Sequence, residues 1–307
     1  MQVKLKRSRT SKPPRKSPPT RGRTLAKVPV WAWLFGALAA VALAGLLLFL
    51  VRSAVSQAAW ATLGTQDVHS LAFVDDDPQR LLFGHHGGIL ESRDGGRTWT
   101  ALPVRDDAMS MAPAQDGSIV IAGHNVFTAS RDGGQTWSAI PADLPGLDIH
   151  GFARDPLDPA RMWAYLATGG LWESTDGGAQ WTRVREANVA FPFAIVRGGA
   201  TRLLGVDATG LVASDDGGRT WASVGTPPTY PMTAVAATPD GETIYAASPE
   251  GLFRSADGGA TWRKTTFAGA PFAIATSPDG MTVALVDQST EFFRSADGGQ
   301  TWPPSGS

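Results

Sequence analysis

The stretch SRDGGRTW at residues 92–99 decides the fold, because its pattern Ser-x-Asp-x-Gly-x-x-Trp returns five more times along the chain. Successive copies lie 38 to 44 residues apart, a period that holds four short strands and is typical of one blade of a β-propeller. The sequence therefore predicts a repetitive all-β ring. The defining residues of the six copies are Ser92, Asp94, Gly96, Trp99, Ser130, Asp132, Gly134, Trp137, Ser174, Asp176, Gly178, Trp181, Ser214, Asp216, Gly218, Trp221, Ser255, Asp257, Gly259, Trp262, Ser295, Asp297, Gly299 and Trp302.

Each copy has the features of a hairpin turn. It lies between an apolar stretch, such as residues 170–173, and a stretch that begins with tryptophan, such as residues 137–140. Glycine reaches positive φ without steric cost, and Ser and Asp side chains hydrogen-bond nearby backbone amides, so both favour a closed turn. The tryptophan ring can bury apolar area between neighbouring blades. We therefore expect these residues to be structural rather than catalytic.

The repeated pattern resembles the Asp-box, or BNR, repeat over residues 60–302. That repeat occurs in sialidases, other propeller glycosidases, sortilin-type receptors and propeller assembly factors of photosystem II. The chain is also similar to bacterial Asp-box proteins labelled as glycosyl hydrolases. The resemblance implies a β-propeller but no single function, because the shared residues are turn residues and not a common active site.

Closure of the ring is expected to use both ends of the repeat region. Pro303 and Pro304 follow the last tryptophan and leave almost no outer strand, because proline cannot donate to a ladder. Residues 60–64 resemble residues 221–225 but have no box before them. We therefore predict that residues 59–64 form the outer strand of the last blade and close a six-bladed propeller over residues 59–307. A seventh blade is the alternative, but no unassigned stretch is long enough for one.

The segment before the ring is predicted to anchor the chain in a membrane. Residues 1–28 carry ten Lys or Arg and no acid, which indicates a disordered basic tail. Residues 29–51 are uncharged and long enough for a transmembrane helix, followed by a short linker over residues 52–58. The positive-inside rule places the tail in the cytoplasm and the propeller outside, as a single-pass protein of the cell membrane. A signal peptide cleaved after residues 56–58 is the alternative.

Composition narrows the classes of partner. The chain has no cysteine, so neither disulfides nor thiol chemistry is available to it. All 28 acidic residues follow residue 52, and the ring carries a net charge of −12. Such a surface repels nucleic acid and other anionic polymers, and it disfavours sialic acid as a substrate. The partners expected are the membrane and an extracytoplasmic protein or glycan.

All five histidines are expected on the rim opposite the boxes, within the first three blades. Imidazoles near carboxylates at a channel mouth can bind a divalent metal or act as acid and base near neutral pH. Solvated loop residues are the alternative, since the spacing matches no short metal-ligand motif. The residues expected to contact a ligand are Asp67, His69, His85, His86, His124, Asn125, Asp148 and His150, with His69, His85, His124 and His150 as the metal ligands.

Two functions remain open at this stage. The first is a membrane-anchored binding or assembly module that uses the rim opposite the boxes, and the second is a glycosyl hydrolase of sialidase-like fold. A hydrolase needs two facing carboxyl groups, and strand order alone gives no carboxyl separation. Catalytic residues therefore stay unassigned. The acids expected on that rim are Asp67, Asp106, Asp107, Asp143, Asp148, Glu186, Asp207, Glu250, Asp287 and Glu291.

Overall fold

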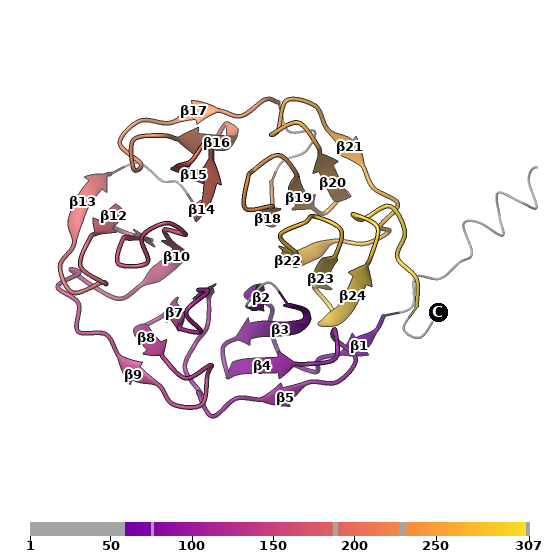
Figure 1. The fold of residues 1–307 in the computed structure, drawn as a ribbon, viewed down its shortest axis with the longest axis horizontal. Coiled ribbons are helices and arrows are strands. Elements are labelled where there is room, and N and C mark those ends of the chain that lie inside the picture. Colours follow the sequence, from indigo (N-terminus) through magenta and orange to yellow (C-terminus); the bar gives the residue numbers. More distant parts are fainter. Residues whose placement is uncertain (1–58, 75–76, 187–189, 227–230, 305–307) are drawn as a thin grey trace, which may run out of the picture. The chain divides into compact units, whose positions relative to one another are not determined.

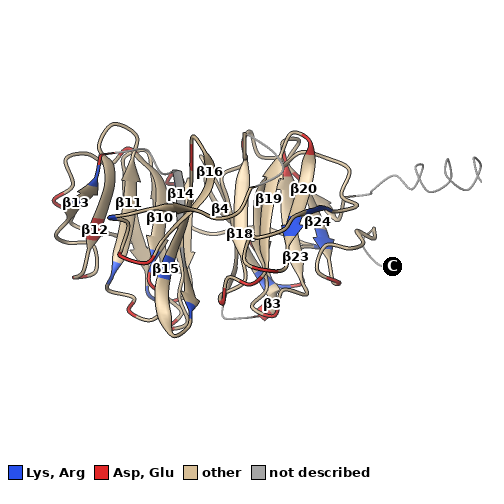
Figure 2. Cartoon of the chain, turned by 90° about the horizontal axis from the view of Figure 1, so that it is seen from above, with Lys and Arg blue, Asp and Glu red and all other residues tan. Residues whose placement is uncertain are grey.

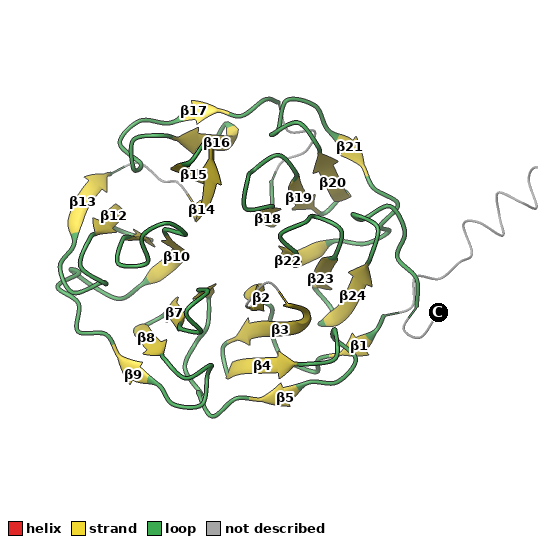
Figure 3. Ribbon diagram, viewed as in Figure 1, coloured by secondary structure: helices red, strands yellow, loops and turns green. Residues whose placement is uncertain are grey.

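The computed structural model describes residues 59–74, 77–186, 190–226 and 231–304. These residues form six four-stranded antiparallel sheets around a central axis, so the prediction of a six-bladed propeller is confirmed (Figure 1). The described part of the chain contains strands and loops but no helix (Figure 3). No helix among these residues is long and apolar enough to cross a membrane. The predicted span over residues 29–51 lies outside the described residues.

Each blade runs from an inner strand at the axis to a short outer strand at the periphery. Blade 1 holds β2 (Ser70–Val74), β3 (Asp77–His85), β4 (Gly88–Ser92) and β5 (Thr100–Ala101), and blade 2 holds β6 (Ser110–Pro113), β7 (Ile119–Gly123), β8 (Val126–Ser130) and β9 (Ser138–Ala139). Blade 3 holds β10 (Ile149–Arg154), β11 (Met162–Leu166), β12 (Gly170–Ser174) and β13 (Thr182–Arg185), and blade 4 holds β14 (Ala190–Arg197), β15 (Ala200–Asp207), β16 (Gly210–Ser214) and β17 (Ala222–Ser223). Blade 5 holds β18 (Ala234–Ala237), β19 (Ile244–Ser248), β20 (Gly251–Ser255) and β21 (Arg263–Lys264), and blade 6 holds β22 (Pro271–Thr276), β23 (Val283–Asp287), β24 (Glu291–Ser295) and β1 (Ala61–Thr62).

Strand β1 is the outer strand of blade 6, although it precedes every other strand in the chain. It pairs antiparallel with β24, with Ala61 opposite Phe292. The backbone N–H of Trp60 donates to the carbonyl of Phe292 at 2.7 Å, and its indole Nε1 donates to the carbonyl of Pro303 at 2.9 Å. Residues from the two ends of the propeller therefore complete one sheet, and β24 has no open edge at this position.

Hydrogen bonds inside the Asp boxes explain why the same four residues recur. In the first box Ser92 Oγ donates to Asp94 Oδ1 at 2.9 Å and accepts the N–H of Gly96 at 2.8 Å. Asp94 Oδ1 in turn accepts the N–H groups of Arg97 and Thr98 at 3.0 and 2.9 Å. The indole of Trp99 donates to the carbonyl of Gly96 at 3.0 Å, and Gly96 has φ of 97°, which favours glycine. The box is thus a self-contained turn.

The core lies mainly within the blades and between neighbouring blades. The second strand of each blade contains a buried run of at least four residues, and Ile121, Trp163 and Tyr245 on β7, β11 and β19 have no exposed surface. Trp99 and Trp181 pack edge-to-face on a phenylalanine ring of an adjacent blade, Trp181 on Phe127 with centroids 5.8 Å apart. This packing holds the blades together without disulfides.

The alternating strand directions divide the turns between two rims. The box rim carries the six Asp boxes and the turns between the first and second strands. The opposite rim, called here the histidine rim, carries the turns between the second and third strands and the connections from each outer strand to the next inner strand. In side view the loops gather at these two rims, and many Asp and Glu residues lie on them (Figure 2).

Candidate functional site

Seven side chains from blades 1 to 3 form a continuous group on the histidine rim. Three aspartates occupy equivalent places just before the inner strands β2, β6 and β10. His69 and His150 stand two positions after the first and the third of these aspartates. His86 and His124 begin the turns β3–β4 and β7–β8. We call this group the histidine–aspartate row: Asp67, His69, His86, Asp107, His124, Asp148 and His150.

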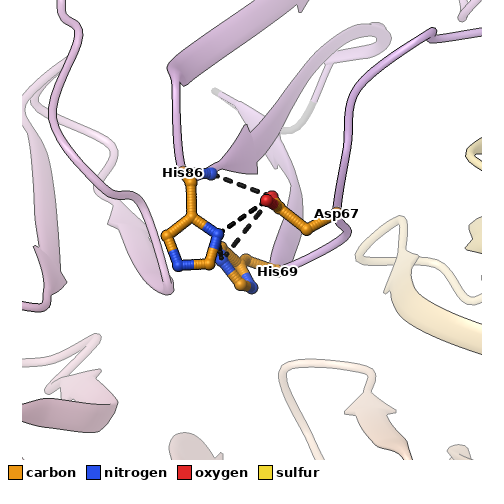
Figure 4. Close-up of side chains that lie close together, drawn as sticks. All are labelled: Asp67, His69 and His86. Carbon is orange, nitrogen blue, oxygen red and sulfur yellow. Dashed lines mark hydrogen bonds and ion pairs between the residues drawn. The ribbon is translucent and has the colours of Figure 1, made fainter.

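Asp67, His69 and His86 make the first part of the row (Figure 4). The backbone N–H of His86 donates to Asp67 Oδ1 at 2.9 Å, and His86 Nδ1 lies 2.6 Å from Asp67 Oδ2. His69 Nε2 lies 3.0 Å from His86 Nδ1 and 3.6 Å from Asp67 Oδ1. Two imidazole nitrogens and a carboxylate thus converge within a few ångströms.

Asp107 forms the centre of the row and is its most buried carboxylate, with 8% of its surface exposed. Its Oδ2 accepts the backbone N–H of His124 at 3.1 Å and lies 2.7 Å from His124 Nδ1. Its Oδ1 is buried, faces His69 Nε2 at 3.5 Å and has no hydrogen-bond partner. Buried polar atoms are nearly always paired, so this oxygen requires an explanation.

The third part of the row is more open. His150 Nε2 lies 3.0 Å from Asp148 Oδ1, and His124 Nε2 lies 3.6 Å from the same oxygen. About half of the Asp148 side chain is exposed. Ring contacts connect the parts, because the rings of His86 and His124 are nearly parallel with centroids 5.8 Å apart.

In the first part of the row, the surroundings shift the pKa values of the side chains in different directions. Burial lowers the pKa of His69, although the charges of Asp107 and Asp67 oppose this effect. The hydrogen bond to Asp67 raises the pKa of His86. Burial works to raise the pKa of Asp67, but the hydrogen bonds from His86 outweigh it and the pKa is lowered. Near neutral pH the first part therefore holds a charged carboxylate and a neutral His69, a combination suited to holding a proton or a cation.

His85, which the sequence suggested as a metal ligand, lies outside the row. Its ring stacks on Phe83 with centroids 6.1 Å apart, and its Nδ1 accepts the N–H of Gly87. The strand register gives the reason. His85 pairs with Gly88, so His86 is the first residue of its turn and is the structural equivalent of His124. Asn125 takes the second turn position with φ of 59° and also stays outside the row.

Several other acids expected on this rim have turn or packing roles. Asp143 contacts the third Asp box instead, where its Oδ1 accepts the N–H of Trp181 at 2.7 Å. Asp207 and Asp287 each accept backbone N–H groups of their own turns. Glu186 pairs with Arg183 at 2.9 Å on the periphery. Asp107 is one of the acids expected on this rim. Like Asp67 and Asp148 it stands just before an inner strand, and this shared position could have identified it as a member of the row.

A small hollow of about 190 Å³, lined by both apolar and polar side chains, opens at the channel mouth beside the row. The first residues of several inner strands line it, and His69, Met109, Phe152, Phe193 and Phe272 give it its character. None of the described residues that line it is a carboxylate. The larger hollow of about 680 Å³ lies between the boxes of blades 5 and 6, on the other rim.

Comparison with known proteins finds one matching family model and many similar solved structures. A family model described as the photosynthesis system II assembly factor YCF48 matches residues 53–210. A search of curated protein sequences finds no match. Among solved structures, YCF48 from Cyanidioschyzon merolae is 20% identical, with a TM-score of 0.53 over 81% of this chain and 88% of that one. A structure of YCF48 bound to D1 peptide is 17% identical, with a TM-score of 0.53 over 77% and 95%.

The GH74 xyloglucanase from Xanthomonas campestris is also similar, at 20% identity and a TM-score of 0.57 over 80% of this chain. The alignment covers 46% of the xyloglucanase, so the chain spans less than half of that enzyme's length. At these identities the likeness to solved structures shows the propeller fold alone.

Proposed function

The chain belongs to the family of the photosystem II assembly factor YCF48, and on that premise we propose that it is a binding module that holds a segment of another protein at its histidine rim. The observation that carries the proposal is the hollow at the channel mouth directly beside the histidine–aspartate row, where several aromatic side chains stand next to polar ones. Hollows lined by apolar side chains, with a few polar groups beside them, are typical of sites that bind a ligand group and orient it. The structure of YCF48 bound to D1 peptide supports it, since a protein of the same family binds a peptide.

The surroundings of the hollow define the chemistry of the segment. Phe152, Phe193 and Phe272 offer aromatic surface to an apolar side chain. The carboxylates of Asp67, Asp107 and Asp148 make the adjoining edge acidic, so it favours a segment with a basic group. The net charge of −12 on the ring also favours a basic segment, by attraction at longer range. We also propose that residues 29–51 hold the propeller at the outer side of the cell membrane.

A glycoside hydrolase is not favoured by a specific observation. Two carboxyl groups would have to face each other across a sugar-sized pocket. The hollow on the histidine rim has no carboxylate among its described lining residues, and the aspartates of the row are engaged by histidines. Binding is therefore the function that we carry forward.

A photo-crosslinking experiment tests the proposal. A photo-reactive phenylalanine replaces Met109, which lines the hollow, and in a matched variant it replaces Gln135, which is exposed on the box rim of the same blade. After irradiation of living cells, position 109 should give one dominant adduct with an extracytoplasmic protein, and position 135 should not. Equal adducts from both positions, or none from position 109 in a folded chain, would contradict the proposal.

A further inference from the structure

The first part of the histidine–aspartate row has more electron-pair donors than its protons can satisfy. His86 Nδ1 lies 2.6 Å from Asp67 Oδ2 and 3.0 Å from His69 Nε2. One ring nitrogen carries at most one hydrogen, so a hydrogen directed at the carboxylate leaves the short contact with His69 unpaired. His69 Nε2 also faces one oxygen of Asp67 at 3.6 Å and one of Asp107 at 3.5 Å. A cation among Asp67, His69 and His86 would satisfy the ligand atoms of these three side chains together.

The spacing of the donor atoms fits a single small ion. Two nitrogens that each lie about 2.0–2.1 Å from one zinc ion are roughly 3 Å apart when the angle between the bonds is near 95°. Ligand atoms at a wider angle of about 120° are roughly 3.6 Å apart for the same bond lengths. The contacts of His69 Nε2 with His86 Nδ1 at 3.0 Å and with Asp67 Oδ1 at 3.6 Å fall within this range.

Asp107 is the second, independent observation. Its Oδ1 is buried without a hydrogen-bond partner, and leaving a buried polar atom unpaired costs roughly 1–3 kcal/mol, more for a charged group. The other oxygen is held by the backbone and ring of His124, so the carboxylate is oriented with Oδ1 toward His69. A metal ion on His69 Nε2 would place a positive charge near this oxygen, and His124 would be a positioning residue that orients the carboxylate.

We propose that this cluster binds one divalent transition-metal ion through His69 Nε2, His86 Nδ1 and the carboxylate of Asp67, with the carboxylate of Asp107 beside His69 as a supporting negative charge. Imidazole nitrogens with carboxylate oxygens suit zinc and its neighbours in the first transition series. The ligands come from two segments of blade 1, and Asp107 lies beside them from the segment before the first strand of blade 2. The inference does not rest on the proposed function, because the ligand is the metal alone.

Calorimetric titration with Zn²⁺ tests the site on the full chain, purified in detergent without a polyhistidine tag and stripped with a chelator. We expect one zinc per chain, confirmed by elemental analysis. His86→Ala should abolish this binding, and Asp107→Asn should weaken it at least 10-fold, in line with losses seen at other metal sites. His150→Ala is the matched control, because it removes a histidine of the same row from outside the ligand set and should leave the affinity unchanged.

Three results would overturn the proposal. One is the absence of saturable zinc binding in a folded wild-type chain. Another is loss of zinc in His150→Ala with retention in His86→Ala, which would place the ion in the third part of the row. Should a variant unfold, X-ray absorption on the zinc-loaded wild type still decides. A first shell without two imidazole nitrogens at about 2.0–2.1 Å would contradict the ligand set.

Discussion

Ser130 of the second Asp box shows how one hydroxyl group makes two of the hydrogen bonds that close the turn. It is 1% exposed, donates to Asp132 Oδ1 at 2.8 Å and accepts the N–H of Gly134 at 2.8 Å. The serines of the other five boxes make the same bond to their glycine N–H at 2.8 to 3.0 Å. Serine recurs because the buried N–H of the box glycine needs an acceptor, and only a short side chain at this position reaches it.

Ser130→Ala should therefore lower the free energy of unfolding by about 1–3 kcal/mol, because it leaves a buried N–H without a partner. Urea unfolding followed by tryptophan fluorescence measures the change. The control is Ser138→Ala in β9, where the serine is exposed and the expected change is within about 0.5 kcal/mol. Equal losses in the two variants would contradict the role assigned to the box hydroxyl.

The box aspartates predict how stability responds to acid. Hydrogen bonds from the hydroxyls of Thr136 and Thr261 are the main cause that lowers the pKa of Asp132 and of Asp257 to about 2. In the unfolded chain an aspartate has a pKa of about 3.9. The folded form holds the lower pKa, so the stabilisation is present above pH 4 and is lost as the pH falls toward 2.

Urea midpoints should hence fall steeply between pH 4 and pH 2, with little contribution from these groups between pH 7 and pH 5. Asp257→Asn keeps an oxygen acceptor but cannot titrate, so its midpoint should fall less over the acid range than that of the wild type. A wild-type midpoint that stays constant down to pH 2 would show that the boxes do not govern acid stability.

At the scale of elements, the seam between β1 and β24 is the contact that closes the ring. Trp60 contributes its indole bond to Pro303, and the guanidinium groups of Arg97 and Arg294 lie 5.0 and 5.7 Å from its ring. Such cation–π contacts add to a strand that is only two residues long. The seam therefore combines backbone pairing with side-chain contacts from both ends of the propeller.

Trp60→Ala should destabilise the chain by about 2 kcal/mol, less than a fully buried tryptophan because Trp60 is half-buried. Hydrogen exchange in β22, β23 and β24 should rise before exchange in the other blades. Trp60→Phe keeps an aromatic ring but loses the N–H donor, and should cost about 1 kcal/mol. Wild-type exchange throughout blade 6 of Trp60→Ala would contradict a closing role for this residue.

Elements were easier to predict from the sequence than the site. The box spacing predicts the blades because each box marks the same hairpin, and residues 60–64 resemble residues 221–225 closely enough to indicate the outer strand that Ala61 and Thr62 form. A shift of one residue separated His85 from His86, since apolar strands alone do not determine where a two-residue turn begins. The contact of Asp107 with His69 joins two blades, and such a contact depends on how blades pack rather than on local pattern.

At the scale of the whole molecule, the charges divide the chain into a basic first segment and an acidic ring. Eleven of the 27 basic residues precede residue 53, and all 28 acids follow residue 52. This asymmetry underlies the proposed orientation across a membrane, because basic residues stay on the cytoplasmic side. The absence of cysteine makes that orientation easy to test, since any introduced thiol is the single one in the chain.

Single-cysteine labelling tests the topology. Gly146→Cys adds a thiol in an exposed loop where a side chain meets no other atom within 4 Å, and Lys12→Cys adds one in the basic segment. A membrane-impermeant maleimide applied to intact spheroplasts should label position 146 at once and position 12 only after permeabilisation. The reverse pattern would contradict the orientation, and a mature chain that begins after residue 58 would favour the cleaved signal.

The β1–β24 pair also constrains the order of events during synthesis. Ala61 leaves the ribosome early, whereas its partner Phe292 follows almost the entire propeller. Until then the nascent chain carries an unpaired strand and an incomplete sixth sheet, and either will accept a matching segment from a neighbouring molecule. Crowded polysomes should consequently favour exchanged dimers, in which each polypeptide lends its first strand to the other's last blade.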